Sequence, residues 1–190
     1  GKGENFVASD VAALLPVTRK FIFLEEGDVC EIRRDGYRIS DQDGNNIQRK
    51  VHESALSADA AEKGDFPHYM LKEIHEQPRA VAQTLEERVA GGKLLEAAFG
   101  PAAQAVFART EAVRIVACGT NPVVPNNTLF VSVSQSGETA DTLAALRMAK
   151  QAGYLSQLAI CNVPESSLVR ESDLVMLTRA GPEIGVASTK

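Results

Sequence analysis

Apolar and polar positions follow the alternation of strands and helices in residues 112–190. Four short apolar runs are typical of buried strands, and they cover residues 113–117, 129–133, 158–161 and 174–177. A helix is predicted over 139–152, with Leu143 and Leu146 on one face, and Ser166 can cap a short helix that continues to Glu171. Strands alternating with helices predict an α/β fold, in which helices cover both faces of a parallel sheet.

The first 50 residues follow the two-residue period of β-structure. Turn sequences rich in Gly, Asp and Asn separate short apolar runs, and glycine there supplies the positive φ angles that tight hairpins need. The runs lie at 20–24, 29–33 and 37–40, and the turns at 26–28, 35–36 and 43–45. We expect a small antiparallel meander at the edge of a larger β-domain.

Residues 51–111 indicate short helices and a polar linker. Pro78 breaks the first predicted helix and can open the second as its first residue. Val81, Leu85 and Val89 form one apolar stripe of that second helix, and Gly91-Gly92 ends it. The linker is expected at 57–65, and helices at 68–76, 78–90, 94–99 and 102–107. We interpret the region as a packing and connecting module without chemistry of its own.

The connection between the first two strands of the α/β region is unusually short. Only residues 121–128 separate them, whereas a parallel crossover needs about a dozen residues or more and usually contains a helix. Either these strands are not parallel neighbours, or a segment is missing from the sequence. We favour the missing segment, and expect an interruption of the chain between Thr120 and Val124.

Composition narrows the class of protein. The net charge of −5 argues against nucleic-acid binding, and no apolar run approaches the length of a membrane span. The three cysteines, Cys30, Cys118 and Cys161, form no CxxC pair, so we expect a reducing, cytoplasmic setting and no zinc site. His68 and His75 are interpreted as surface residues. The first residues lack a signal pattern and an initiator Met, so the chain is not expected to start where a gene product would.

The residues with candidate chemistry lie between the strand at 129–133 and the helix that follows it. Ser134, Ser136 and Thr139 offer three hydroxyls, Gln135 offers an amide, and Gly137 permits close approach of the backbone. A helix N-terminus adds unpaired N–H groups and a partial positive charge. The pattern favours a phosphate monoester held by neutral donors, although a serine in this place is also an ordinary helix cap.

Two other loops could contribute to this phosphate site, and the absence of several motifs excludes other kinds of site. The 118–120 loop and the hydroxyl-bearing 185–190 segment could converge on the same ligand. No GxxxxGK[ST] or GxGxxG pattern is present, so a nucleotide or dinucleotide cofactor has no support, and we expect neither cofactor nor metal. No histidine follows His75, so no Ser-His-Asp or Cys-His arrangement is readable.

Several segments together resemble the glutamine–fructose-6-phosphate aminotransferase family, also called glucosamine-6-phosphate synthases. Those near the proposed site are VACGT at 116–120, SVSQSGETADT at 132–142, AICNV at 159–163, SLVRESD at 167–173 and EIGVASTK at 183–190. Parts of 68–78 resemble the start of the isomerase half, and parts of 6–19 resemble the later glutaminase domain. The resemblance covers nearly the whole chain.

The resemblance implies an activity and a division of the chain. The family transfers the amide nitrogen of glutamine to fructose 6-phosphate and isomerises the product to glucosamine 6-phosphate, with two sugar-isomerase (SIS) domains. It implies the end of the glutaminase domain at 1–56, a linker at 57–67, the helical start of the isomerase half at 68–111 and part of the first SIS domain at 112–190. It also implies a homodimer.

The resemblance assigns the site residue by residue. Ser134, Gln135, Ser136 and Thr139 would bind the sugar phosphate, Val186 and Ser188 would contact the sugar, and Thr120 would lie beside the pocket. The chain departs from the family in lacking the N-terminal Cys nucleophile and the acid–base residues of the second SIS domain, and Asn121 replaces a Ser that contacts phosphate. We therefore expect a partial chain that holds no catalytic residue. The alternative is a non-catalytic SIS module that binds a sugar phosphate as a regulatory signal.

Overall fold

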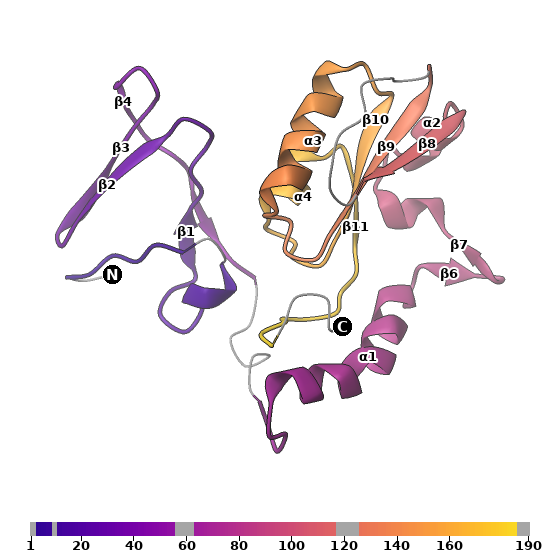
Figure 1. Ribbon diagram of the computed structural model, residues 1–190, viewed down its shortest axis with the longest axis horizontal. Coiled ribbons are helices and arrows are strands. Elements are labelled where there is room, and N and C mark those ends of the chain that lie inside the picture. Colours follow the sequence, from indigo (N-terminus) through magenta and orange to yellow (C-terminus); the bar gives the residue numbers. More distant parts are fainter. Residues whose placement is uncertain (1–2, 9–10, 56–62, 117–125, 186–190) are drawn as a thin grey trace. The chain divides into compact units, whose positions relative to one another are not determined.

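The computed structural model of the chain describes residues 3–8, 11–55, 63–116 and 126–185. It folds into two compact units, residues 1–59 and residues 60–190, and each is described by itself. Figure 1 labels most helices and strands of both units and colours the chain from the N-terminus to the C-terminus. Among the described residues, no helix combines the length and apolar composition that crossing a bilayer requires.

The described residues of the N-terminal unit form two small antiparallel sheets. After the 3₁₀ turn η1 (Ala12–Leu14), β1 (Lys20–Ile22) pairs with β5 (Val51–Glu53). The meander consists of β2 (Val29–Arg33), β3 (Gly36–Ser40) and β4 (Asn46–Ile47). The meander is therefore confirmed from residue 29 onwards, while the run at 20–24 joins a separate sheet. Its partner is β5, residues 51–53, which the sequence places at the start of the helical region.

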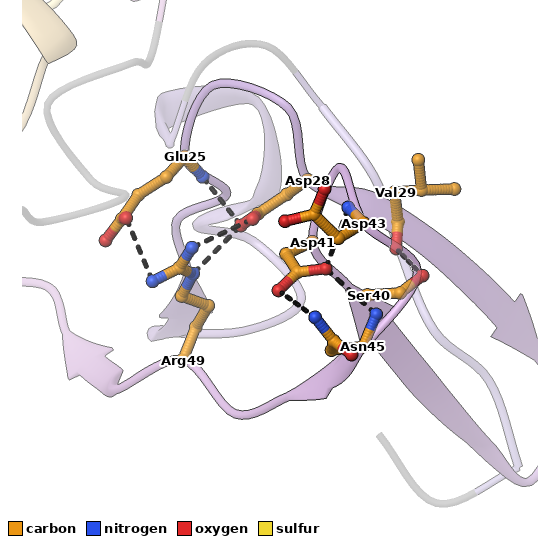
Figure 2. Close-up of polar contacts among 8 residues, drawn as sticks. All are labelled: Glu25, Asp28, Val29, Ser40, Asp41, Asp43, Asn45 and Arg49. Atoms are coloured by element: carbon orange, nitrogen blue, oxygen red, sulfur yellow. Dashed lines mark hydrogen bonds and ion pairs between the residues drawn. The ribbon is translucent and has the colours of Figure 1, made fainter.

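An ion-pair cluster fixes the turn before β2. Arg49 donates hydrogen bonds to both carboxylate oxygens of Asp28 at 2.8 and 2.9 Å and forms an ion pair with Glu25 at 2.9 Å (Figure 2). The Asp28 carboxylate also accepts the Glu25 N–H at 2.8 Å, so the turn closes on itself. These contacts tie the start of β2 to the segment that leads into β5. The nearby Asp41 carboxylate accepts N–H groups of Asp43 and Asn45 in the β3–β4 turn.

The second unit begins with a single long helix. Helix α1 (Tyr69–Leu85) continues through Pro78, so the predicted break at that residue is wrong. Proline lacks the N–H that would donate one helical hydrogen bond, but the helix continues on both sides of Pro78. Gly91 and Gly92, both with positive φ, form the turn between β6 (Val89–Ala90) and β7 (Lys93–Leu94) instead of ending a helix. A 3₁₀ turn, η3 (Glu96–Phe99), and helix α2 (Ala103–Phe107) follow.

A four-stranded parallel sheet is the centre of this unit. Its order is β11 (Leu174–Leu177), β10 (Ser156–Cys161), β9 (Thr128–Ser134) and β8 (Ala112–Val116), and all three pairings are parallel. Helix α3 (Ala140–Gln151) connects β9 to β10, and α4 (Ser167–Glu171) connects β10 to β11. The predicted α/β class, with a parallel sheet, flanking helices and small antiparallel sheets before it, is confirmed.

Side chains of β9 and β10 point alternately into two apolar cores. Phe130, Ala159 and Cys161 pack with buried residues of α3 and α4, whereas Leu129 and Leu158 pack on the opposite face with η3 and α2. Figure 1 shows α3 and α4 on one side of the sheet. Both faces of its central strands are thus covered, as the near-continuous apolar runs predict.

The edge strand β8 is a parallel neighbour of β9. Val113 pairs in register with Leu129, and Ile115 with Val131, so the possibility that the two strands are not parallel neighbours is wrong. The other possibility, a missing segment, therefore keeps its support. Val113 and Ile115 are 56% and 69% exposed, although they share the face of the buried Leu129. The expected interruption between Thr120 and Val124 lies outside the described residues.

Candidate functional site

The proposed phosphate loop, residues 134–139, lies between the carboxyl end of β9 and the first residue of α3. Ser134 Oγ accepts the N–H of Gly137 at 3.0 Å, and Ser136 Oγ accepts the N–H of Glu138 at 3.2 Å. The Ser134 and Thr139 hydroxyl oxygens are 3.4 Å apart. The loop is therefore a tight turn at the start of α3, in which the Ser134 and Thr139 hydroxyls lie next to each other.

Gly137 is required by both the conformation and the packing of this loop. Its φ of +69° is one that side-chain-bearing residues rarely adopt. A Cβ there would lie 2.5 Å from Ser166 Cβ and 2.8 Å from Cys161 Sγ. The loop thus rests directly on the end of β10 and the residue before α4.

Hydrogen bonds from the first turn of α4 also hold the loop. Glu138 Oε1 accepts the N–H of Ser167 at 2.8 Å, and the Gly137 carbonyl accepts the N–H of Leu168 at 3.0 Å. Ser166 occupies the N-cap position as predicted, but its side chain makes no capping bond, and Glu138 bonds the first helical N–H instead. The loop and α4 therefore form one hydrogen-bonded unit.

An ion pair joins the two helices that frame the loop. Arg147 of α3 donates two hydrogen bonds to the carboxylate of Glu171 of α4, at 2.9 and 3.1 Å. Hydrogen bonding to this guanidinium is the main reason that the pKa of Glu171 lies below its usual value. The bidentate geometry fixes α4 against α3, and through α4 it steadies the loop.

Four of the seven predicted site residues can be located. Ser134, Gln135, Ser136 and Thr139 all belong to the loop, and the first three are half-buried while Thr139 is exposed. Thr139 occupies the N-cap position of α3, and its side chain makes no capping bond there. Thr120, Val186 and Ser188 lie outside the described residues. Ser134 and Ser136 accept backbone N–H bonds within the loop, so their hydroxyls organise the turn itself.

Asn162 also belongs to this region, although it is not among the seven predicted site residues. Its backbone N–H donates to the Gln135 carbonyl at 3.3 Å. Its side-chain oxygen accepts the Thr178 hydroxyl at 3.1 Å and the Ala180 N–H at 2.9 Å, and its amide donates to the Gly181 carbonyl at 2.7 Å. Asn162 therefore links the loop to the segment that follows β11. An Asn directly after a buried strand is a usable sequence signal for such a residue.

The arrangement offers neutral hydrogen-bond donors for an anion. The start of the twelve-residue helix α3 carries a partial positive charge, and three hydroxyls lie in the turn before it. Within the described residues, no three His, Cys, Asp or Glu side chains gather closely enough to hold a metal ion. The hydroxyls and the start of α3 are therefore suited to hold an oxyanion.

The comparisons with known proteins first define the class of protein. A family model described as the SIS domain matches residues 115–190, the span that contains most of the parallel sheet and the loop. A solved structure of the C-terminal domain of glucosamine-fructose-6-phosphate aminotransferase from Francisella tularensis is 43% identical, with a TM-score of 0.63. It matches over 68% of this chain and 45% of that chain. The second unit thus has the fold of a SIS domain.

The curated relatives then identify the family. Glutamine–fructose-6-phosphate aminotransferase (isomerizing) of Pseudomonas aeruginosa is 52% identical, and that of Escherichia coli is 48% identical, each over all of this chain. The chain belongs to the family of these aminotransferases, and it spans about a third, 36%, of their length. The alignments run over 221 residues while the chain has 190, so the relatives contain additional residues inside the matched region.

Proposed function

We propose that the chain is part of an enzyme that transfers the amide nitrogen of glutamine to fructose 6-phosphate and isomerises the product to glucosamine 6-phosphate. The observation that carries this proposal is identity of 52% over the entire chain to an aminotransferase of that name. In this proposal the chain supplies part of the sugar-phosphate site and none of the catalytic residues. Glutamine would be handled by protein outside this chain, and the enzyme would be a cytoplasmic homodimer.

The proposal divides the chain into the same four parts that the family resemblance implies. Residues 1–56 would be the end of the glutaminase domain, 57–67 a linker, 68–111 the helical start of the isomerase half and 112–190 part of the first SIS domain. The division into compact units at residue 59 and the SIS match from residue 115 support this layout. A regulatory SIS module would not need the N-terminal unit, and the relatives match that unit as well, which favours the enzyme.

The loop at 134–139 would bind the phosphate of the sugar. Ser134, Gln135, Ser136 and Thr139 are the proposed ligands in this turn, and Thr120, Val186 and Ser188 complete the site by family resemblance. The Thr139 hydroxyl is exposed and lies 3.4 Å from that of Ser134, so both can reach one anion. Because all donors are neutral, binding should depend on salt less than binding to a Lys or Arg site.

The Thr139→Ala variant tests this site in the full chain by calorimetric titration with fructose 6-phosphate. A hydrogen bond to a charged group contributes about 1.5–3 kcal/mol, so the affinity should fall roughly ten- to a hundred-fold. Thr110→Ala is the matched control, because the Thr110 hydroxyl bonds the Val106 carbonyl just before the amino end of β8. Equal affinities of wild type and Thr139→Ala would show that this hydroxyl does not bind the substrate.

A further inference from the structure

Glu73 is a buried carboxylate that bonds a segment far along the chain. It lies on α1 and is 2% exposed. Its Oε1 accepts the backbone N–H groups of Ile184 at 2.6 Å and Gly185 at 3.0 Å. A buried charge is costly unless it is hydrogen-bonded, and bonds from N–H groups to a carboxylate are stronger than neutral ones. The contact therefore fixes residues 184 and 185 against the helix.

The packing of Gly185 shows independently how closely this segment approaches α1. A Cβ on Gly185 would lie 2.8 Å from Glu73 Oε2 and 2.8 Å from the backbone nitrogen of Met70. The backbone of residue 185 thus lies against the first turn of α1 with no room for a side chain. Both the carboxylate and the glycine serve the same close contact.

Polar groups also hold the end of β11 and the residues directly after it. From α1 and just beyond it, the Thr84 hydroxyl donates to the Thr178 carbonyl, and the Arg88 guanidinium donates to the Leu177 carbonyl. Asn162 bonds residues 178, 180 and 181 with its side chain, and its backbone N–H bonds the phosphate loop at Gln135. One chain of contacts therefore runs from the loop through Asn162 to the segment that Glu73 holds.

We propose that Glu73 is a positioning residue for recognition of the sugar rather than of the phosphate. Residues 184 and 185 directly precede Val186 and Ser188, to which the proposed function assigns contacts with the sugar, so this inference rests on that function. By fixing the backbone at 184 and 185, Glu73 would set where the following residues begin relative to the phosphate loop. The loop itself has separate supports in α4 and Gly137, so phosphate binding should not need Glu73.

Two probes separate these roles in the full chain. Calorimetry with fructose 6-phosphate and with inorganic phosphate would compare wild type, Glu73→Ala, Glu73→Gln and the control Glu86→Ala, an exposed carboxylate at the end of the same helix. Glu73→Ala should bind fructose 6-phosphate at least about ten-fold more weakly, because the sugar would then have to order residues 184 and 185 on binding, and should bind phosphate normally. Glu73→Gln keeps an oxygen that accepts both N–H groups, and should restore sugar binding.

Hydrogen exchange at Ile184 and Gly185 reports the contact without any ligand. Both amides should exchange faster in Glu73→Ala and at the wild-type rate in Glu73→Gln and Glu86→Ala. The positioning role would be overturned if exchange is unchanged in Glu73→Ala, or if this variant loses affinity equally for fructose 6-phosphate and for inorganic phosphate. If wild type does not bind fructose 6-phosphate, the proposed function fails and the sugar role fails with it. If wild type binds and Glu73→Ala shows no sugar-selective loss, only the inference about Glu73 fails.

Discussion

At the scale of single residues, the loop depends on one glycine as much as on its hydroxyls. Ser134 and Ser136 each accept an N–H from inside the loop, so they shape the turn. Gly137 lets that turn lie against Ser166 and Cys161. The sequence shows the hydroxyls and the glycine together. It does not show that Glu138 bonds Ser167, because that contact depends on how β10 and α4 return to the loop.

Replacing Gly137 by alanine tests this packing. Overpacking of this kind costs about 1–3 kcal/mol, and the positive φ adds strain, so Gly137→Ala should lower the free energy of unfolding and weaken binding of fructose 6-phosphate. Gly153→Ala is the matched control, because Gly153 has φ +83° and a Cβ there would meet nothing within 4 Å. Urea unfolding and calorimetry measure both effects. If the two variants lose equal stability, packing around Gly137 is not the cause.

At the scale of elements, the hydrophobic pattern predicts the parallel strands and α3 correctly, but it predicts the end of α1 and the role of the Gly91-Gly92 turn wrongly. The strand predicted at 174–177 coincides with β11, and the helix predicted at 102–107 nearly coincides with α2. Both predictions succeed because a buried apolar run and a helical spacing are local signals. Pro78 and the Gly91-Gly92 pair were misinterpreted, since α1 tolerates a proline inside it and the glycines serve a hairpin. The pairing of β1 with β5 depends on contacts about thirty residues apart, which no short pattern contains.

The contact between Asp28 and Arg49 predicts a pH-dependent stability of the N-terminal unit. Hydrogen bonds from Arg49 lower the pKa of Asp28 from 3.8 to about 2. A depressed pKa stabilises the fold above the unfolded value, and this stabilisation is lost as the pH falls from about 4 through about 2. Asp28→Asn should therefore be less stable than wild type at pH 7, and the difference should shrink toward pH 2.

Hydrogen exchange of peptides from β2 and β3 between pH 7 and pH 2.5, corrected for the intrinsic pH dependence of exchange, measures this difference within the unit itself. Asp43→Asn is the control, because Asp43 is an exposed aspartate in the neighbouring β3–β4 turn (Figure 2). The difference in exchange protection between Asp43→Asn and wild type should stay constant between pH 7 and pH 2.5. Equal protection of wild type and Asp28→Asn at pH 7 would contradict the role of the ion pair.

At the scale of the whole molecule, the family match and the sheet agree on one point. The relatives contain additional residues inside the matched region, and only residues 117–127 connect β8 to β9, fewer than the dozen or more that a parallel crossover usually needs. Both observations are consistent with the missing segment, which remains a prediction. For the site, the 134–139 loop follows from a local pattern of hydroxyls and a glycine before a helix, whereas the role of Asn162 depends on the segment after β11 returning to it. Thr120, Val186 and Ser188 lie outside the described residues and stay predictions.

The exposed edge of the sheet has a consequence for how the protein behaves in solution. Among the described residues, β8 pairs with a strand on one side only, and Val113 and Ile115 present an apolar surface to water there. Open strand edges of this kind promote association between molecules, and lysine on the edge opposes it. We expect the average mass in sedimentation to rise with concentration, and Ile115→Lys to reduce that rise. Val7→Lys, which changes a valine that is 74% exposed and outside any strand, should leave the rise unchanged, and equal behaviour of the two variants would assign the association to another surface.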